Sequence, residues 1–506
     1  MDVFYTHLTE QLARSRAYMA KARNKLAAIT YRLPDEIIAA IFSFSMGGDP
    51  SQEELPLKDG IRSIYRRLYT LFAVCSNWLR IGLSTGALWS LIPVLEYESK
   101  GSRYSGIYLG LERFTSTNLY LAGDLSGQLD NDFLTSITHF GSRFRSLNLC
   151  GETYDTLKDT VACILRQATP GHLTDFSVCY RRCYPTPQPK YLFPPDSFEH
   201  IILMGVAVLL NTLRLSGFGL DWSTLRFTGL VQLRFQATQF KDASVMNAFL
   251  FAIASAPALH TLEMIDVYSA PIWLPNEQPT PRVSLPSLRT LYLQDLDEEI
   301  LLPVVHSIAP GPYQTILSFI SGDGFVIRNH PEGESYYGWL SALRDSKIDT
   351  LMIFGGWTLG YELNSILGAL PSIQSLYIGD YYLDEEMLRA LVRPIEFDTY
   401  SGNFNFPKIR VLYFWDCTFF LSDGSTLYSF KEVVTSHGIQ ELGLGGKMAF
   451  SECISPQPVR FDDPDGDYYT APIKKWLTDN VPKFKLINSP NELPGYGFQA
   501  DVWKLW

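Results

Sequence analysis

The chain has 506 residues, of which 46% are hydrophobic and 19% are charged. This length is too great for a single core and suits two or three domains or one extended repeat array. The formal charge of −11 at pH 7 argues against nucleic acid as the main partner, because phosphate binding requires a basic surface. The seven cysteines are an odd number spread along the chain, which is typical of a reduced intracellular protein, so we expect it in the cytoplasm, the nucleus or both.

We find no stretch with the composition of a signal peptide or a membrane span. The chain begins Met1-Asp2-Val3-Phe4 and soon turns basic and polar, without the apolar core of a signal peptide. The longest apolar runs, such as Ile201 to Leu210, are about half the length that a bilayer requires. We therefore expect no membrane partner.

The first residues have helical spacing. Residues 4 to 29 lack proline and glycine, and their leucines recur at near-helical intervals, which predicts one amphipathic helix in a leading segment of residues 1–32. A solvated helix and a short coiled coil with a partner are both open interpretations. Residues 33 to 46 predict a second helix, with Pro34 in its first turn, where a missing N–H costs nothing.

The pattern then predicts a loop and a third helix. Residues 47 to 60 are polar, acidic and glycine-rich, and we expect them to form an inserted loop. Ile61 to Ile81 predict the third helix, which Gly82 and Gly86 end. Residues 33–95 together are expected to form one small helical domain.

Short strand signals of the form Leu-x-Leu recur after about residue 105. The paired apolar positions of about twelve units are Leu119 and Leu121, Leu147 and Leu149, Phe176 and Val178, Leu213 and Leu215, Leu233 and Phe235, Leu262 and Met264, Leu291 and Leu293, Leu317 and Phe319, Leu351 and Ile353, Leu376 and Ile378, Leu412 and Phe414, and Leu442 and Leu444. Helical patterns such as Ala243 to Ala254 lie between them. Spacing of about 25 to 30 residues is typical of leucine-rich repeats.

The predicted fold class is therefore α/β, with parallel strands. We expect residues 105–450 to form an irregular solenoid whose parallel sheet lines its concave face, and residues 451–506 to form a C-terminal cap or tail. An ordinary α/β domain with buried parallel strands would give similar apolar runs and remains an alternative.

Three ordered blocks in the helical domain resemble an F-box. The segment Leu33-Pro34-Asp35-Glu36-Ile37-Ile38-Ala39-Ala40-Ile41-Phe42 is similar to its opening, Leu71 to Ile81 to its middle, and Ala87 to Ile92 to its end. The resemblance covers about 60 residues, and the insertion at Gly47 to Gly60 departs from the family pattern. With leucine-rich repeats behind it, the chain resembles the F-box proteins abundant in mushroom-forming fungi.

The resemblance implies a substrate receptor of a Skp–cullin–F-box ubiquitin ligase. The F-box would bind the Skp-type adaptor, which connects to the cullin scaffold, and the repeats would hold a target protein. By the same resemblance, the docking surface or its supporting core consists of Leu33, Pro34, Ile37, Ile38, Ile41, Phe42, Val74, Cys75, Trp78 and Trp89. Alternatively, these residues form the core of a helical cap on the repeats.

Aromatic residues recur between the paired apolar positions of the strands. Alternation along a strand places Tyr292, Tyr377 and Tyr413 on the concave face, and tyrosine is enriched in protein interfaces. Three aspartates lie just beyond these strands, namely Asp295, Asp380 and Asp416. We expect these six residues to bind the target, and a merely solvated sheet face is the alternative.

The sequence offers little for catalysis or metal binding. Gly82-Leu83-Ser84-Thr85-Gly86 matches a nucleophile elbow, but such an elbow requires a preceding strand, and a helix is predicted here. Cys179 and Cys183 lack the paired spacing of a zinc site. We therefore expect no cofactor and no enzyme. The hypotheses are a ligase receptor, a leucine-rich-repeat scaffold that binds no ligase and, least favoured, a serine hydrolase.

Overall fold

The computed structural model divides the chain into two compact units. The first unit consists of Met1–Asp124 with Lys504–Trp506, and the second of Leu125–Trp503. The structure describes residues 2–27, 33–47, 55–95, 111, 118–125, 131–181, 191–270, 280–320, 342–344, 346–355, 360–394, 406–421, 425–450, 458–463, 467–488, 493 and 502–505. Each unit is described by itself.

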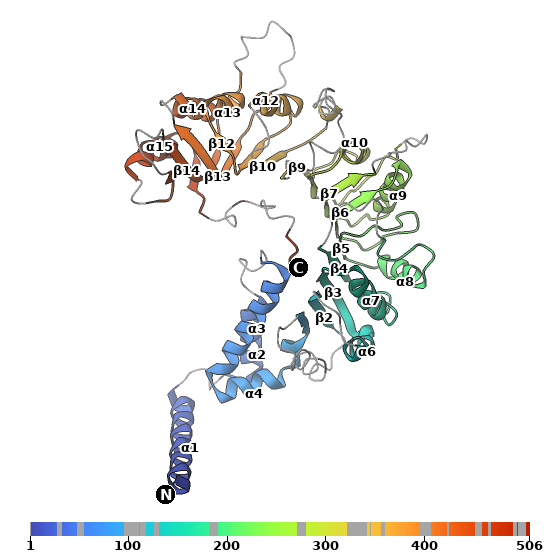
Figure 1. Cartoon of the computed structure of the whole chain (residues 1–506), viewed down its shortest axis with the longest axis vertical. Helices are drawn as coiled ribbons and strands as arrows, with labels where there is room; N and C mark the ends of the chain where they lie inside the picture. Colours follow the sequence, from blue (N-terminus) through green and yellow to red (C-terminus); the bar gives the residue numbers. More distant parts are fainter. Residues whose placement is uncertain are drawn as a thin grey trace. The chain divides into compact units, whose positions relative to one another are not determined.

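The first unit is mainly helical. Its elements are α1 (Asp2–Ala27), α2 (Asp35–Gly47), α3 (Leu57–Val74), α4 (Ser76–Ser84), the 3-10 helix η3 (Gly86–Trp89), β1 (Leu91–Leu95) and β2 (Leu119–Leu125) (Figure 1). β1 and β2 pair in parallel. The boundaries of α1 and α2 agree with the predicted helices to within a few residues.

The region of the third predicted helix differs from expectation. It consists of two helices, because Cys75 is extended (φ −162°, ψ 165°) and its Sγ accepts a hydrogen bond from the Trp78 N–H at 3.5 Å, which caps α4. The predicted loop also ends earlier, because α3 starts at Leu57. Leu57 and Ile61 lie one turn apart and are both buried, and this apolar spacing outweighs the polar composition around them.

The second unit contains an open, mostly parallel sheet. Its strands are β3 (Phe144–Gly151), β4 (Asp175–Tyr180), β5 (Thr212–Ser216), β6 (Gln232–Phe240), β7 (Thr261–Ser269), β8 (Thr290–Gln294), β9 (Gln314–Phe319), β10 (Thr350–Phe354), β11 (Ser375–Gly379), β12 (Tyr382–Leu383), β13 (Val411–Leu421), β14 (Glu441–Phe450), β15 (Val459–Arg460) and β16 (Lys483–Leu486). Within this unit, only the described pairing of β15 with β14 is antiparallel. The predicted α/β class with parallel strands is confirmed.

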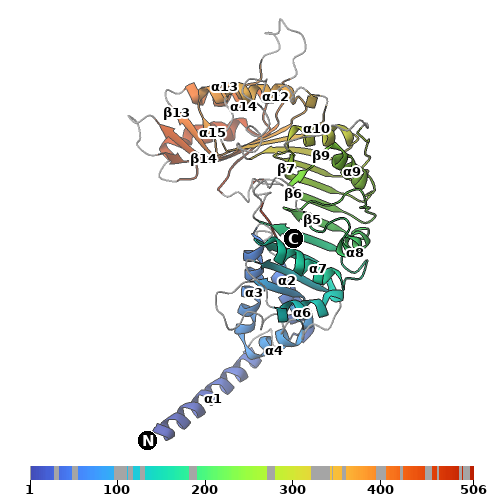
Figure 2. The ribbon, with the colours of Figure 1, turned by 45° about the vertical axis from the view of Figure 1, so that its right-hand side comes forward.

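Helices of the second unit lie along one face of this sheet (Figures 1 and 2). They are α6 (Asn131–His139), α7 (Tyr154–Leu165), α8 (Phe198–Ala207), α9 (Ala243–Ala254), α10 (Glu298–Ser307), α12 (Gly360–Ala369), α13 (Glu385–Leu391), α14 (Ser425–His437) and, after β15, α15 (Asp467–Asn480), with the short η4 (Gly141–Arg143) before β3. We call the other face of the sheet the helix-free face.

The strands align their apolar residues in register. Leu213 of β5 is paired with Leu233 of β6, which is paired with Leu262 of β7. These side chains face the helices, as the packing of Phe235 on Phe249 of α9 illustrates, with ring centroids 6.5 Å apart. The intervening residues therefore line the helix-free face.

The register departs from the repeat alignment at β9. Leu317 is paired with Leu351 of β10, as the repeat alignment predicts, but on its other side it is paired with Leu293 instead of Leu291. Thr315 occupies the position opposite Leu291, where it is buried and its N–H donates to Asp349 Oδ2 at 2.9 Å. A polar residue with a local partner therefore replaces an apolar one at this step.

Gly82→Ala should destabilise the first unit by about 1–3 kcal/mol, because overpacking forces a buried ring to move. A Cβ atom at Gly82 would lie 1.9 Å from Cε1 of the buried Phe72. Chemical denaturation followed by circular dichroism measures the effect. Gly205→Ala in α8 is the matched control, since a Cβ there meets nothing within 4 Å and alanine favours a helix by up to about 1 kcal/mol. Equal effects of the two changes would contradict the packing argument.

Buried His437 links stability to pH. Its Nδ1 accepts the Ile409 N–H at 3.2 Å and its Nε2 lies 2.8 Å from the Leu391 carbonyl oxygen, so the ring is neutral with its proton on Nε2. Burial lowers the pKa of His437 below its ordinary value of 6.5. The unfolded chain thus takes up a proton before the folded chain does, and stability is lost as the pH falls below that value.

His437→Asn should reduce the loss of melting temperature between about pH 7.5 and about pH 5.5 relative to the wild type. Asparagine can still accept the Ile409 N–H but does not titrate. Differential scanning fluorimetry at both pH values measures the loss. His7→Asn, at an exposed position of α1, should leave the wild-type dependence intact, and an unaltered dependence in His437→Asn would refute the assignment.

Candidate interaction surfaces

Helix α2 has apolar side chains on two faces. Ile38 and Phe42 lie one turn apart and are buried. On an adjacent face, Ile37, Ile41 and Phe44 follow a helical i, i+4, i+7 spacing and are 48%, 43% and 80% exposed. A helix with two apolar faces is typical of one that is covered on both, so the exposed stripe is a candidate docking surface.

An aromatic core holds α2 against α3 and α4. Phe42 contacts Trp78 edge to face, with ring centroids 5.1 Å apart, and also packs on Phe72 at 6.4 Å. Phe72 in turn contacts Trp89, whose Nε1 donates to the Gly82 carbonyl oxygen at 3.0 Å. The buried face of α2 is therefore fixed, and the direction of the exposed stripe is fixed with it.

A surface ion pair joins the start of α2 to α4. Arg80 Nη2 donates to both carboxylate oxygens of Asp35, at 3.0 and 2.8 Å. Both side chains are more than half exposed, so solvent screening limits the contribution to well under about 1 kcal/mol. The aromatic core, not this pair, positions the helices.

The residues that the F-box resemblance assigned differ in exposure. Pro34, Ile37, Ile41 and Val74 are exposed, whereas Ile38, Phe42 and Trp89 are buried, with Leu33, Cys75 and Trp78 between these extremes. Sequence reasoning missed Phe44, Leu79 and Leu83, which are exposed as well. Phe44 could have been found from its seven-residue spacing from Ile37.

The tyrosines predicted to bind a target lie on the helix-free face but are not accessible. Tyr292 and Tyr413 are fully buried and Tyr377 is 8% exposed. Tyr377 and Tyr413 stack with ring centroids 5.0 Å apart, and the Tyr292 hydroxyl donates to Gln294 Oε1 at 2.8 Å. The prediction treated this face as open, whereas within the chain these rings are buried; their part in target binding stays a prediction.

Residues of the C-terminal segment, by which we mean the chain after strand β16, pack against these rings. Ile487 and Leu493, which follow the last strand β16, belong to one buried cluster with the three tyrosines; its other members are Ile265, Ile316 and Met352, with Phe354, Val411 and Trp415 at its edge. Ile487 is also tied by its backbone, since its N–H donates to the Leu444 carbonyl oxygen at 3.0 Å. Burial raises the pKa of the Tyr377 hydroxyl to about 12, as expected in an apolar setting.

The three predicted aspartates have a backbone role. Asp295, Asp380 and Asp416 follow their strands with φ of 49°, 54° and 49°, in the left-handed region that aspartate tolerates better than most residues. Asp295 Oδ1 accepts the Ile320 N–H at 2.9 Å and is half-buried, whereas Asp380 and Asp416 are exposed. The last two remain available to a partner.

The same segment inserts a tryptophan at the other end of the helix-free face. Trp503 is 7% exposed, and its Nε1 donates to Asn148 Oδ1 at 2.9 Å. The guanidinium carbons of Arg214 and Arg234 lie 5.1 and 5.6 Å from its ring centroid. Arg234 also pairs with Glu263 at 3.6 Å. Burial, with a smaller contribution from the Arg234 charge, lowers the pKa of Arg214 to about 10, which leaves it charged at neutral pH.

The sites considered for catalysis and metal binding have local roles where the structure describes them. Ser84 ends helix α4, so a helix does precede it, and its hydroxyl donates to the Ile81 carbonyl oxygen at 3.0 Å. Cys183 lies outside the described residues. Cys179 hydrogen-bonds Cys150 on the neighbouring strand, and this bond lowers the pKa of the Cys179 thiol.

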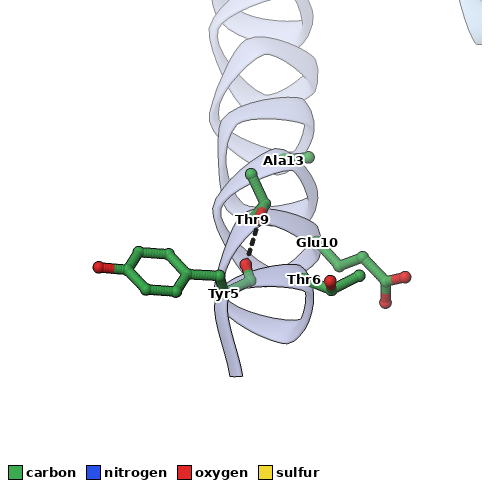
Figure 3. Close-up of a pocket in the computed structure, with 5 residues that line it drawn as sticks. All are labelled: Tyr5, Thr6, Thr9, Glu10 and Ala13. Carbon is green, nitrogen blue, oxygen red and sulfur yellow. Dashed lines mark hydrogen bonds between the residues drawn. The ribbon is translucent and has the colours of Figure 1, made fainter. Parts of the chain in front are cut away.

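One surface hollow lies on α1 alone. Tyr5, Thr6, Thr9, Glu10 and Ala13 line it, and the Thr9 hydroxyl within it donates to the Tyr5 carbonyl (Figure 3). A single helix cannot enclose a ligand, so the hollow supports no binding site. None of the helices in the described part of the chain is both long enough and apolar enough to cross a bilayer.

No protein-family model matches the chain, and no curated protein matches it.

Tyr292→Ala should lower the free energy of unfolding by about 3–5 kcal/mol, the cost of removing a large buried ring. Tyr292→Phe should cost only about 0.5–1.5 kcal/mol, because it removes one hydrogen bond. Tyr428→Ala is the matched control, since Tyr428 is 69% exposed and should contribute less than about 0.5 kcal/mol. Urea denaturation distinguishes the three, and a tolerated Tyr292→Ala would mean that this face is open in solution.

Proposed function

We propose that the chain is a substrate-recognition adaptor of a Skp–cullin–F-box ubiquitin ligase. The observation that carries the proposal is the apolar stripe of Ile37, Ile41 and Phe44 on α2, within the segment that resembles the opening of an F-box. Helix-face anchors that enter a groove are a common recognition mode. The rigid aromatic core beneath the stripe supports such docking, because it presents the anchors without further ordering cost.

We assign the second unit the role of target receptor, as an irregular leucine-rich-repeat solenoid. Two features support the assignment: parallel strands whose apolar residues lie in register, and helices along one face of the sheet. In such an array the helix-free face binds partners. Tyr292, Tyr377 and Tyr413, with Asp295, Asp380 and Asp416, remain our candidate target-binding residues on that face, although the tyrosines require displacement of the C-terminal segment.

The alternative is a leucine-rich-repeat scaffold that binds no ligase. In that case α2, α3 and α4 would be a helical cap, and the stripe would contact nothing essential. The half-exposed isoleucines favour the ligase receptor, because a cap that ends an array normally has a polar outer face.

Ile37→Asp combined with Ile41→Asp should reduce binding of a co-expressed Skp-type adaptor at least about tenfold, since charges replace two apolar anchors. Affinity purification of the tagged full chain, followed by titration calorimetry of the complex, measures the loss. Both positions are half exposed in the chain itself, so the melting temperature should change little.

Ile201→Asp is the matched control. Ile201 is an isoleucine on helix α8 that is 57% exposed in the second unit, and its replacement should leave adaptor binding unchanged. If the wild-type chain captures no Skp-type adaptor, or if the double variant binds as well as the wild type, the ligase proposal fails and the scaffold remains.

A further inference from the structure

The chemical character of the helix-free face changes from its β3 end toward β13. In successive register positions of β3 to β7 one row of residues is polar: Asn148, Ser177, Arg214, Arg234 and Glu263. Beyond it this row contains Tyr292 and Ile316. They share one buried cluster with Met352, Tyr377 and Tyr413, which lie two residues further along their strands because of the register change at β9. A ligand of the whole face must therefore have an apolar part and a part suited to cations.

The C-terminal segment matches this change in character. Its described residues Ile487 and Leu493 lie in the cluster with the tyrosines, whereas Trp503 lies on the polar half. Its described residues thus contact both the apolar and the polar part of the helix-free face. Three apolar anchors spaced 6 and 10 residues apart in the sequence resemble the way an extended peptide binds a surface.

The Trp503 pocket has the features of a recognition site. Its walls are preordered, since Arg214 Nε donates to Ser177 Oγ at 2.8 Å and Arg234 Nη2 to Gln236 Oε1 at 2.7 Å. Two guanidinium groups near one ring stabilise it through cation–π attraction, which is stronger when the groups are desolvated. The side-chain oxygen Oδ1 of Asn148 accepts a hydrogen bond from the indole N–H of Trp503, and phenylalanine has no such donor.

Charge favours an acidic ligand. This row contains two arginines, Arg214 and Arg234, and one carboxylate, Glu263. In the sequence of the C-terminal segment, Glu492 directly precedes Leu493, and Asp501 precedes Trp503 by two residues. In the sequence, a carboxylate thus precedes each of these two anchors by one or two residues.

We propose that the pocket formed by Asn148, Arg214 and Arg234 recognises a tryptophan in an acidic segment of a target protein, and that Trp503 occupies it as an internal competitor. The proposal rests on the function of the second unit as a target receptor. A tethered segment has an effective concentration on the order of millimolar, so a target must bind considerably more tightly than that to displace it. The contact of Trp503 with this site therefore sets a threshold for target capture.

The test uses the full chain and a fluorescent synthetic peptide of its residues 487–506 as the probe. Trp503→Ala in the chain should increase affinity for the peptide at least about tenfold over the wild type, because the pocket is vacated. A peptide with alanine in place of its first tryptophan should lose that affinity, and so should the chain variant Trp503→Ala with Arg214→Met. Tyr382→Ala, at a position 72% exposed in the second unit, should bind as weakly as the wild type.

A second measurement uses the wild-type chain, so that its result does not depend on correct folding of a variant. Saturating peptide should accelerate hydrogen exchange in residues 487–503 of the wild type, and unchanged exchange would overturn the proposal. A folded Trp503→Ala chain that binds the peptide no better than the wild type would overturn it as well, since the segment would then be a fixed part of the fold. Capture of the Skp-type adaptor is measured on the same preparations, so failure of the ligase role is detected separately.

Discussion

Parallel pairing in register is the constraint on which the second unit depends. Neighbouring strands lie about 4.8 Å apart, so each position of one strand is repeated beside the same position of the next. This arrangement brings Leu213, Leu233 and Leu262 into one row against the helices. It equally brings the residues between them into a row on the other face, where no helix covers them. The fold therefore leaves a second face of the sheet that the described helices do not bury.

Residues of the C-terminal segment bury the apolar part of this face. Tyr292, Tyr377 and Tyr413 could not remain open to water without a large exposed aromatic patch, which proteins rarely keep unless a partner covers it. Ile487 and Leu493 cover it in the chain itself. Stability and recognition are thereby in competition on one surface, because any target that reaches these rings must first replace contacts that the chain already makes.

The first unit has the opposite situation. Its aromatic core of Phe42, Phe72 and Trp89 is closed, but α2 keeps an apolar stripe that nothing in the described part of this unit covers. The polar half of the helix-free face differs from both, since Arg214 and Arg234 are buried and charged and gain their partners from side chains and a tryptophan ring. Each candidate surface thus has its own chemistry, apolar in α2 and cationic with aromatic contacts around Trp503.

The α/β class, the twelve strands of the Leu-x-Leu units and the helices α1, α2 and α9 could be predicted from the sequence, because the local spacing of apolar residues sets the face that an element buries. The strands β1, β12, β15 and β16 were not predicted. The sequence also determined which strand residues point away from the helices. The burial of that face is visible only in the tertiary structure. Leu493 and Trp503 are far in sequence from the residues they contact, and no local sequence pattern predicts such a contact. For the same reason Asp295 and Asp380 looked like ligand groups, whereas the left-handed backbone after their strands gives them a local role as well.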